Sequence, residues 1–283
     1  SLNKFDQKFD EVFIPKYMGQ WIYSSLNQKC ITTPVFTKNT KIIYIYHQFG
    51  VPQKFTELKK FARENDLLII EDCAHILDGY MNEKDRIGYL GDFTIFSYSK
   101  FFKCYLLGGI RSNSKDFIDY FDNQISRSSK TQSFINYLLI RLGYAMKMNS
   151  NLRKKFFNMN YSLYNFPSKH LIFLQKIFEQ QLSKEFNLRL KRFQYAKVKL
   201  GNIKEMDFLK YKDLILFKMP IILNPNLKQK IIKKFDIEKL KYELMHFDIN
   251  RNMLNPDYQK VIIIDIGSEN KDFEKQIEII LNV

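Results

Sequence analysis

The chain has 283 residues, of which 45% are hydrophobic and 16% aromatic. This content excludes an intrinsically disordered chain and suffices for one large domain, or for a main domain with a smaller one attached. Lys and Arg outnumber Asp and Glu by 45 to 30, a net charge of +15. The basic residues are spread along the chain without an RNA-recognition signature, so we expect no nucleic-acid partner.

The first part of the chain predicts alternating strands and helices. Strands are expected at 10–17, 41–50, 67–70, 91–100 and 106–113, and helices at 17–26 and 52–67. In the second helix Phe55, Leu58, Phe61 and Ala62 share one face, while charged residues cover the rest. The strand 67–70 is wholly apolar, as expected where both faces of a parallel sheet are covered. Strand, helix and strand together predict a right-handed βαβ unit.

The pattern changes after about residue 120. Aromatic- and Lys-rich helical patterns extend from 131 to 200, followed by strands at 214–223 and 260–267 and helices at 227–246 and 271–281. We therefore predict an α/β fold in two parts. A three-layer α/β/α sheet domain spans 1–125, and a helical connection with a smaller α+β domain spans 126–283.

Location and redox state are also predicted from the sequence. Cys30, Cys73 and Cys104 are widely spaced without a C-x-x-C pair, which indicates reduced thiols. The first residues lack the apolar segment of a secretory signal, so a cytoplasmic protein is expected. The stretch 134–148 is too short and too charged to span a bilayer. It predicts a packed helix, although peripheral membrane contact through it stays open.

Several polar residues follow apolar strands, at the edge of the sheet where open α/β folds bind ligands. Asp72, His75 and His47 could together hold a metal, but no further ligand cluster or H-x-x-x-H pair accompanies them, so we predict no metal site. Glu71 and Asp72 are neighbours at a strand end, so their side chains point to opposite faces and do not form a paired-acid site.

Lys100 lies three residues after Ser97, just beyond a predicted strand. A lysine in a desolvated cleft has a lowered pKa and can attack an aldehyde to form a Schiff base. An isolated lysine is more often a solvated surface residue. Here it follows a strand-end aspartate and precedes a Gly pair and another strand, and that joint pattern favours a chemical role.

The segment 44–110 contains a series of short motifs in a fixed order: His47 to Gly50, Ile70 to His75, Gly88 to Asp92, Phe96-Ser97, Lys100 and Gly108-Gly109. With these motifs the segment resembles the DegT/StrS-type nucleotide-sugar aminotransferases, which are fold type I enzymes that use pyridoxal 5′-phosphate. Weaker similarity extends to 188–200, which looks like the family's Arg-Arg-x-Asn-Tyr helix, and to 260–281.

The resemblance implies a role for each matching residue. Asp72 would pair with the pyridine nitrogen and strengthen the ring as an electron sink. His75 would lie near the ring and its 3′-oxygen, and Ser97 would hydrogen-bond the phosphate. Lys100 would bind the cofactor covalently and then move the proton between Cα and C4′. The implied reaction transfers an amino group from glutamate to a keto nucleotide-sugar for a surface polysaccharide or glycan, in a homodimer with shared active sites.

The sequence also departs from the family pattern. It begins after the turn that binds the cofactor phosphate in the family, so a short member without that N-terminal segment is expected. The spacing to the lysine is unusual, which makes Lys103 a second candidate. Tyr17 or Trp21 would supply the aromatic ring that stacks on the cofactor. Two functions therefore stay open: an active transaminase, or a non-catalytic relative that serves as an assembly partner. A basic membrane-surface protein is a third.

Overall fold

The computed structural model describes residues 9–101, 108–127 and 175–283. Lys103, Cys104, the apolar stretch 134–148 and the helical patterns up to residue 174 lie outside these residues. No helix in the described parts of the chain is both long and apolar enough to cross a membrane.

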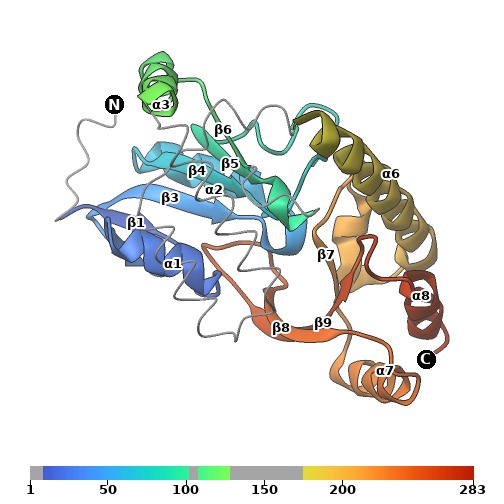
Figure 1. The fold of residues 1–283 in the computed structure, drawn as a ribbon. Coiled ribbons are helices and arrows are strands. Elements are labelled where there is room, and N and C mark those ends of the chain that lie inside the picture. The colour runs from blue at the N-terminus through green and yellow to red at the C-terminus, as the bar shows by residue number, and fades with distance from the viewer. Residues whose placement is uncertain (1–8, 102–107, 128–174) are drawn as a thin grey trace.

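The N-terminal part forms one six-stranded sheet in the order β2-β1-β3-β4-β5-β6 (Figure 1). The first five strands of this order run parallel, and β6 pairs antiparallel with β5 at the edge. All the predicted strands of this part are present, and the short β2 was not predicted. The strands are β1 (Glu11–Phe13), β2 (Ile31–Thr33), β3 (Thr40–Tyr46), β4 (Leu68–Cys73), β5 (Phe93–Ser97) and β6 (Gly108–Ser112).

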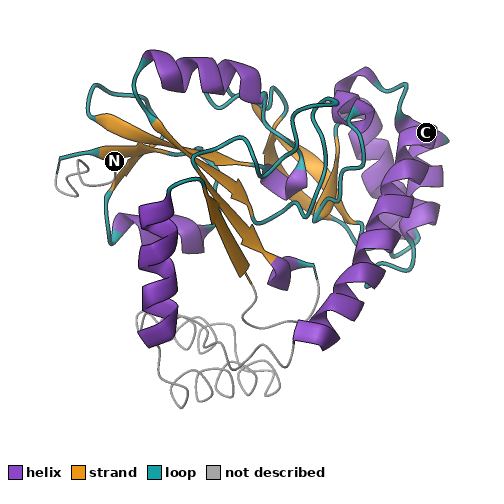
Figure 2. Ribbon diagram, turned by 90° about the horizontal axis from the view of Figure 1, so that it is seen from above, coloured by secondary structure: helices purple, strands orange, loops and turns teal. Residues whose placement is uncertain are grey.

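Helices cover both faces of this sheet, which gives the predicted three layers (Figure 2). On one face α1 (Gln20–Asn27) packs Ile22 and Leu26 against the cluster that contains Ile42, Tyr44 and Tyr46. On the other, α2 (Phe55–Glu64) buries the apolar stripe formed by Phe55, Leu58 and Ala62 against Ile43, Ile45 and Ile69. At the β6 edge lies α3 (Lys115–Arg127), whose Phe117 ring meets Phe93 edge-on at 4.9 Å.

The C-terminal part forms a second, antiparallel sheet in the order β7-β9-β8, with helices beside it (Figure 1). The prediction of a helix over 227–246 is wrong beyond Ile237, because residues 243–248 form a strand that pairs with β9 along its whole length. The elements are α6 (Gln175–Leu200), β7 (Lys218–Ile221), α7 (Pro225–Ile237), β8 (Glu243–Asp248), β9 (Tyr258–Asp265) and α8 (Phe273–Leu281).

The two sheets share one hydrophobic core. The segment after β4 pairs antiparallel with the segment before β7, through Ile76 with Leu216 and Tyr80 with Lys212. Gly50 permits this close approach, since its φ is +95° and an added Cβ would lie 2.2 Å from the His75 carbonyl oxygen. The carboxyl end of β4 is therefore covered by the C-terminal part of the chain.

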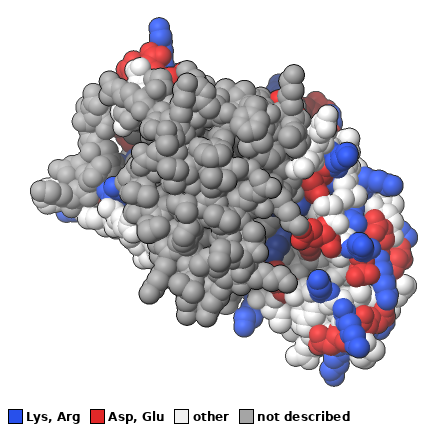
Figure 3. Space-filling view, viewed as in Figure 1, with Lys and Arg blue, Asp and Glu red and all other residues white. Residues whose placement is uncertain are grey.

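The surface charge is mixed rather than segregated on the face drawn in Figure 3, where basic and acidic side chains alternate over the C-terminal part. This agrees with the even spread of Lys and Arg along the sequence.

Candidate functional site

The carboxyl end of β4 sends two adjacent carboxylates to opposite faces of the sheet. Glu71 and Asp72 are both buried, with 0% and 1% exposure. Burying a carboxylate is costly unless hydrogen bonds or charges meet it. Each of the two has its partners in a different set of residues. We call the set around Glu71 the Glu71 cluster. We call Asp72, Tyr44, Ala74, His75, Lys100 and Phe217 the Asp72 cluster.

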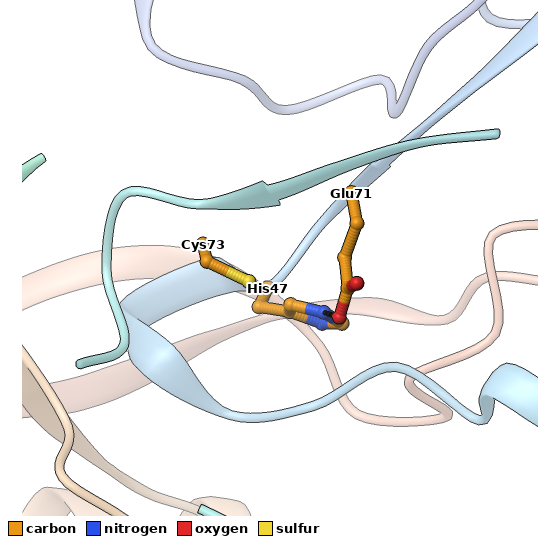
Figure 4. Close-up of side chains that lie close together, drawn as sticks. All are labelled: His47, Glu71 and Cys73. Carbon is orange, nitrogen blue, oxygen red and sulfur yellow. Dashed lines mark hydrogen bonds and ion pairs between the residues drawn. The ribbon is translucent and has the colours of Figure 1, made fainter. Parts of the chain in front are cut away.

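The Glu71 cluster consists of Glu71, His47, Cys73 and the loop 88–94 (Figure 4). His47 Nε2 lies 3.1 Å from Glu71 Oε1. Three backbone N–H groups donate to the same carboxylate, from Gly88 at 2.7 Å, Leu90 at 3.0 Å and Gly91 at 3.2 Å. The carboxylate therefore ties the loop before β5 to β4.

The two glycines and the aspartate of the 88–92 motif each have a structural reason. Gly88 has a φ of +86°, and a Cβ there would lie 2.7 Å from the Phe96 ring. A Cβ on Gly91 would lie 3.0 Å from the Glu71 Cβ. Asp92 accepts the Ile69 N–H at 2.8 Å and so fixes the start of β4. The motif packs this loop tightly against the strand and places its N–H groups on Glu71.

Hydrogen bonding decides the ionisation of the Glu71 cluster. Burial alone would raise the pKa of Glu71, but the hydrogen bonds from His47 and from the loop N–H groups outweigh it and lower the pKa. His47 Nδ1 accepts the Gln53 N–H at 3.2 Å, so the ring proton lies on Nε2 and points at Glu71. The pKa of the Cys73 thiol is raised well above its usual value by burial and by Glu71.

One atom from each of His47, Glu71 and Cys73 lies within 4.8 Å of the others, a spacing that could hold a metal ion. Both ring nitrogens of His47 and both oxygens of Glu71 already have hydrogen-bond partners in the protein. We interpret the cluster as structural. The alternative of a metal held jointly by His47, Asp72 and His75 gains no support, because His47 pairs with Glu71.

The Asp72 cluster lies at the other side of β4. Asp72 Oδ2 accepts the Tyr44 hydroxyl at 2.7 Å, and Oδ1 accepts the Ala74 N–H at 2.8 Å. Burial raises the pKa of Asp72, while these two hydrogen bonds and the charge of Lys100 act to lower it. Each oxygen has one partner in the described residues and keeps a further acceptor position.

His75 is held in a single orientation next to Asp72. Its Nδ1 lies 2.7 Å from the Tyr46 hydroxyl and accepts the Phe49 N–H at 3.2 Å. Burial, together with the charges of Lys100 and Lys218, lowers the pKa of His75 to about 3. The ring is therefore neutral at physiological pH, with Nδ1 as an acceptor and the proton on Nε2.

Lys100 follows β5 through the short 3-10 helix η3 (Tyr98–Lys100). Although the residue as a whole is exposed, its amino group lies 5.8 Å from the centre of the Phe217 ring. Partial burial lowers the pKa of Lys100 against the opposing charge of Asp72, and the charge of Lys218 adds to the lowering. The amino group of Lys100 and the ring of His75 therefore lie beside the same Phe217 ring, at 5.8 Å and 4.7 Å from its centre.

The other candidate residues lie around this group. Ser97 ends β5, is partly buried, and its hydroxyl lies 3.1 Å from that of Ser99. The Tyr17 ring stacks on His246 at 4.3 Å and meets Tyr258 edge-on at 4.8 Å. Tyr17 is therefore packed on the C-terminal sheet. Ser97, at the end of β5, lies three residues before Lys100, which ends η3. The roles of both stay predictions.

Two residues of the C-terminal part complete the site and were missed in the sequence. The Phe217 ring lies 4.7 Å from the His75 ring, and its N–H donates to the His75 carbonyl at 2.9 Å. Lys218 lies 5.5 Å from the same Phe217 ring and forms an ion pair with Glu243 at 2.6 Å. No local signal marks either residue, because they are more than a hundred positions away along the chain.

The helix α6 holds Phe217 in place. Arg189 is 4% exposed, and one of its terminal nitrogens donates to the carbonyls of Leu216 at 2.9 Å and Phe217 at 2.7 Å. Its Nε pairs with Glu185 at 3.0 Å. In the same helix Arg192 donates to the Gly267 carbonyl. The two arginines of the 188–200 motif therefore join α6 to the strands that cover the site.

The residues of the Asp72 cluster fit an aromatic aldehyde with a basic ring nitrogen, such as pyridoxal 5′-phosphate. Lys100 supplies an amine with a lowered pKa, and Asp72 supplies a carboxylate that keeps acceptor positions. His75 adds a neutral ring and Phe217 an apolar wall. A group that contacts Asp72 must share its carboxylate with the Tyr44 hydroxyl, because only 1% of the residue is exposed.

The fold is that of the fold type I pyridoxal-phosphate transferases. A sugar aminotransferase of Streptococcus pneumoniae, Spr1654, in its apo form superposes with a TM-score of 0.59 at 11% identity, over 97% of this chain and 80% of its own. The 3-amino-5-hydroxybenzoic acid synthase gives a TM-score of 0.58 at 11% identity, over 97% and 80%. DesV of S. venezuelae, in complex with a ketimine intermediate, gives 0.58 at 12% identity, over 96% and 78%.

The sequence adds a match to a known family. Residues 29–164 match the DegT/DnrJ/EryC1/StrS aminotransferase family, which confirms the resemblance stated above. The uncharacterized protein MJ1066 of Methanocaldococcus jannaschii is 44% identical over 62 residues. That match spans 22% of this chain and 16% of the relative.

Proposed function

We propose that the protein is a pyridoxal-phosphate-dependent transaminase that acts on a keto nucleotide-sugar. The observation that carries this proposal is that the Lys100 amino group and the His75 ring both lie beside the Phe217 ring, at 5.8 Å and 4.7 Å from its centre, close to the buried carboxylate of Asp72. Lys100, His75 and Asp72 belong to the segment that matches the aminotransferase family. Glutamate as amino donor, a product for a surface polysaccharide or glycan, a cytoplasmic location and a homodimer follow from the family resemblance and are parts of the same proposal.

The residues have distinct tasks in this proposal. Asp72 would bind the ring nitrogen of the cofactor and keep it protonated, His75 would offer its Nε2 proton as a hydrogen-bond donor, and Ser97 would bind the phosphate. The cofactor, when bound, would supply an electron sink. Lys100 would bind the cofactor covalently and would be the group that moves the proton.

The environment of Lys100 suits both of its tasks. A nucleophilic amine must be unprotonated, and burial together with Lys218 lowers its pKa. Asp72 opposes that lowering, so the amine can also carry a proton when the reaction requires an acid. The Phe217 ring, 5.8 Å from the amino group, gives the amine an apolar neighbour on one side.

Covalent trapping tests the proposal directly. The purified protein is incubated with pyridoxal 5′-phosphate, reduced with borohydride, digested and analysed by mass spectrometry. We expect the reduced pyridoxyl group on Lys100, and no trapping in Lys100→Ala. Lys103→Ala is the matched control and should be labelled like the wild type.

Two outcomes would contradict this assignment. Labelling that is lost in Lys103→Ala and kept in Lys100→Ala moves the attachment to Lys103. The absence of any adduct at millimolar cofactor contradicts the transaminase proposal altogether.

A non-catalytic relative is the second candidate, and the closed environment of Asp72 favours it. The Tyr44 hydroxyl and the Ala74 N–H already satisfy a carboxylate that is 1% exposed. A protein of this kind would keep the fold and show no trapping under the conditions above. Salt-sensitive binding to anionic liposomes would instead support the third candidate, a basic membrane-surface protein.

A further inference from the structure

Two tyrosines of β3 are bonded to the two residues that we assign to the cofactor ring. Tyr44 and Tyr46 are two positions apart, so they share one face of the strand. In the parallel register Tyr44 lies opposite Ile70 and Tyr46 opposite Asp72. Each side chain reaches past its partner toward the end of β4. The Tyr44 hydroxyl bonds to Asp72 and the Tyr46 hydroxyl to His75, both at 2.7 Å.

The bond from Tyr44 controls the charge of Asp72. The carboxyl group is almost fully buried, and burial favours its neutral form. A hydroxyl that donates to the carboxylate stabilises the charged form. Without it, the Ala74 N–H would be the one other hydrogen-bond donor to Asp72 among the described residues. Only the charged form can keep a ring nitrogen protonated.

The bond from Tyr46 controls the orientation of His75. The Phe49 N–H can only donate, so Nδ1 must accept and the proton stays on Nε2. Phe49 has a φ of +57°, which is uncommon for a residue with a side chain, so this N–H is placed at a local conformational cost. Tyr46 adds a second contact at the same nitrogen and fixes the plane of the ring.

We propose that Tyr44 and Tyr46 are positioning residues of the transaminase site, which keep Asp72 ionised and His75 in one orientation before the cofactor binds. The inference rests on the proposed function. It explains why β3, whose other residues from Ile42 onward are isoleucines, carries two buried phenols, since a buried tyrosine needs a partner for its hydroxyl.

The test compares Tyr44→Phe and Tyr46→Phe with Tyr242→Phe. Tyr242 donates to Asp236 at 2.9 Å on the surface and is the matched control. Infrared titration of the apo protein follows the protonated carboxyl band of Asp72, assigned with Asp72→Asn. We expect Tyr44→Phe to move that titration upward by about one pH unit, the size of one hydrogen bond, and Tyr242→Phe to leave it unchanged.

The affinity for pyridoxal 5′-phosphate is the second readout. Tyr44→Phe and Tyr46→Phe should each weaken it by roughly tenfold, as expected for one hydrogen bond. In an Asp72→Asn background, the Tyr44→Phe change should alter affinity by less than about twofold, because the pair acts as a unit. This double-mutant cycle separates positioning from a general loss of stability.

The outcomes are distinguishable. An unchanged Asp72 titration in folded Tyr44→Phe, or an affinity loss that persists fully without Asp72, overturns the inference. If the wild type binds no cofactor while the Asp72 titration still shifts, the proposed function fails and the tyrosines have a structural role only. If the cofactor binds to Tyr44→Phe and Tyr46→Phe as well as to the wild type, and less well to Asp72→Asn, the proposed function stands and the inference fails.

Discussion

The two faces of β4 each bury a carboxylate, and the two carboxylates are stabilised by different partners. Glu71 and Asp72 are neighbours, both carboxylates and both buried. Glu71 receives three backbone N–H groups and a histidine from its own chain, and its pKa is lowered. Asp72 receives one N–H and one hydroxyl, and its pKa is raised.

The number of hydrogen-bond donors to each carboxylate separates the structural acid from the functional acid in this motif. A carboxylate that is saturated by backbone donors has no acceptor position to offer, so it serves the fold. A carboxylate that is buried with fewer donors is disfavoured in its charged form, and a cationic ligand can stabilise that charge. The charge of Lys100 also acts on Asp72, whereas Glu71 is bonded to backbone N–H groups of the loop that follows β4.

The largest expected effect comes from removing the saturated acid. Glu71→Ala leaves three buried N–H groups and His47 without an acceptor, so we expect a loss of roughly 3–5 kcal/mol in the free energy of unfolding. Urea denaturation measures it. Glu64→Ala, in an exposed ion pair with Lys60, is the control and should change stability by less than about 0.5 kcal/mol. A loss below about 1 kcal/mol for Glu71→Ala would contradict the structural role.

His75 should produce a distinct acid sensitivity. Its pKa is lowered from 6.5 to about 3 in the folded protein, so below pH 6.5 the unfolded chain takes up a proton that the folded one does not. Stability is therefore lost as pH falls through this window, by at most about 1.4 kcal/mol per pH unit. His75→Gln removes that slope. An equal slope in wild type and variant would show that His75 is not buried as described.

Asp72 should give a pH dependence of folding stability opposite in sign to that of His75. Because its pKa is raised, the folded protein binds the proton more tightly than the unfolded chain does. Stability is therefore lost as pH rises from the usual aspartate pKa to the raised one. We expect Asp72→Asn to be as stable as the wild type at neutral pH, or more stable, while it binds the cofactor more weakly. A large destabilisation would place Asp72 with Glu71 as a structural acid.

The smallest effect concerns Cys73. Its thiol is fully buried, and its pKa is raised well above the usual value by burial and by Glu71. A thiol reagent at mildly alkaline pH should leave Cys73 unlabelled in the folded protein and modify it after denaturation, as peptide mapping can show. Labelling without unfolding would mean that the Glu71 cluster opens readily.

Much of the N-terminal architecture was predictable. The alternation of β-branched strands with the amphipathic stretch 52–67 predicted the βαβ unit, and the apolar run 67–70 predicted a strand covered on both faces. The opposite directions of Glu71 and Asp72 follow from strand geometry alone. The strand β8 was not predictable from its own residues, because the pattern ELMHFD fits a helix as well and only pairing with β9 selects the strand.

The sequence by itself determined the resemblance to the aminotransferase family, the strand-end acids and the lysine after β5, because these depend on short-range pattern and motif spacing. Only the tertiary structure decided which acid is satisfied, since Tyr44, His47 and Gly88 lie 28, 24 and 17 positions from the carboxylates that they contact. It also brought Phe217 and Lys218 to the site, through packing that no local pattern encodes.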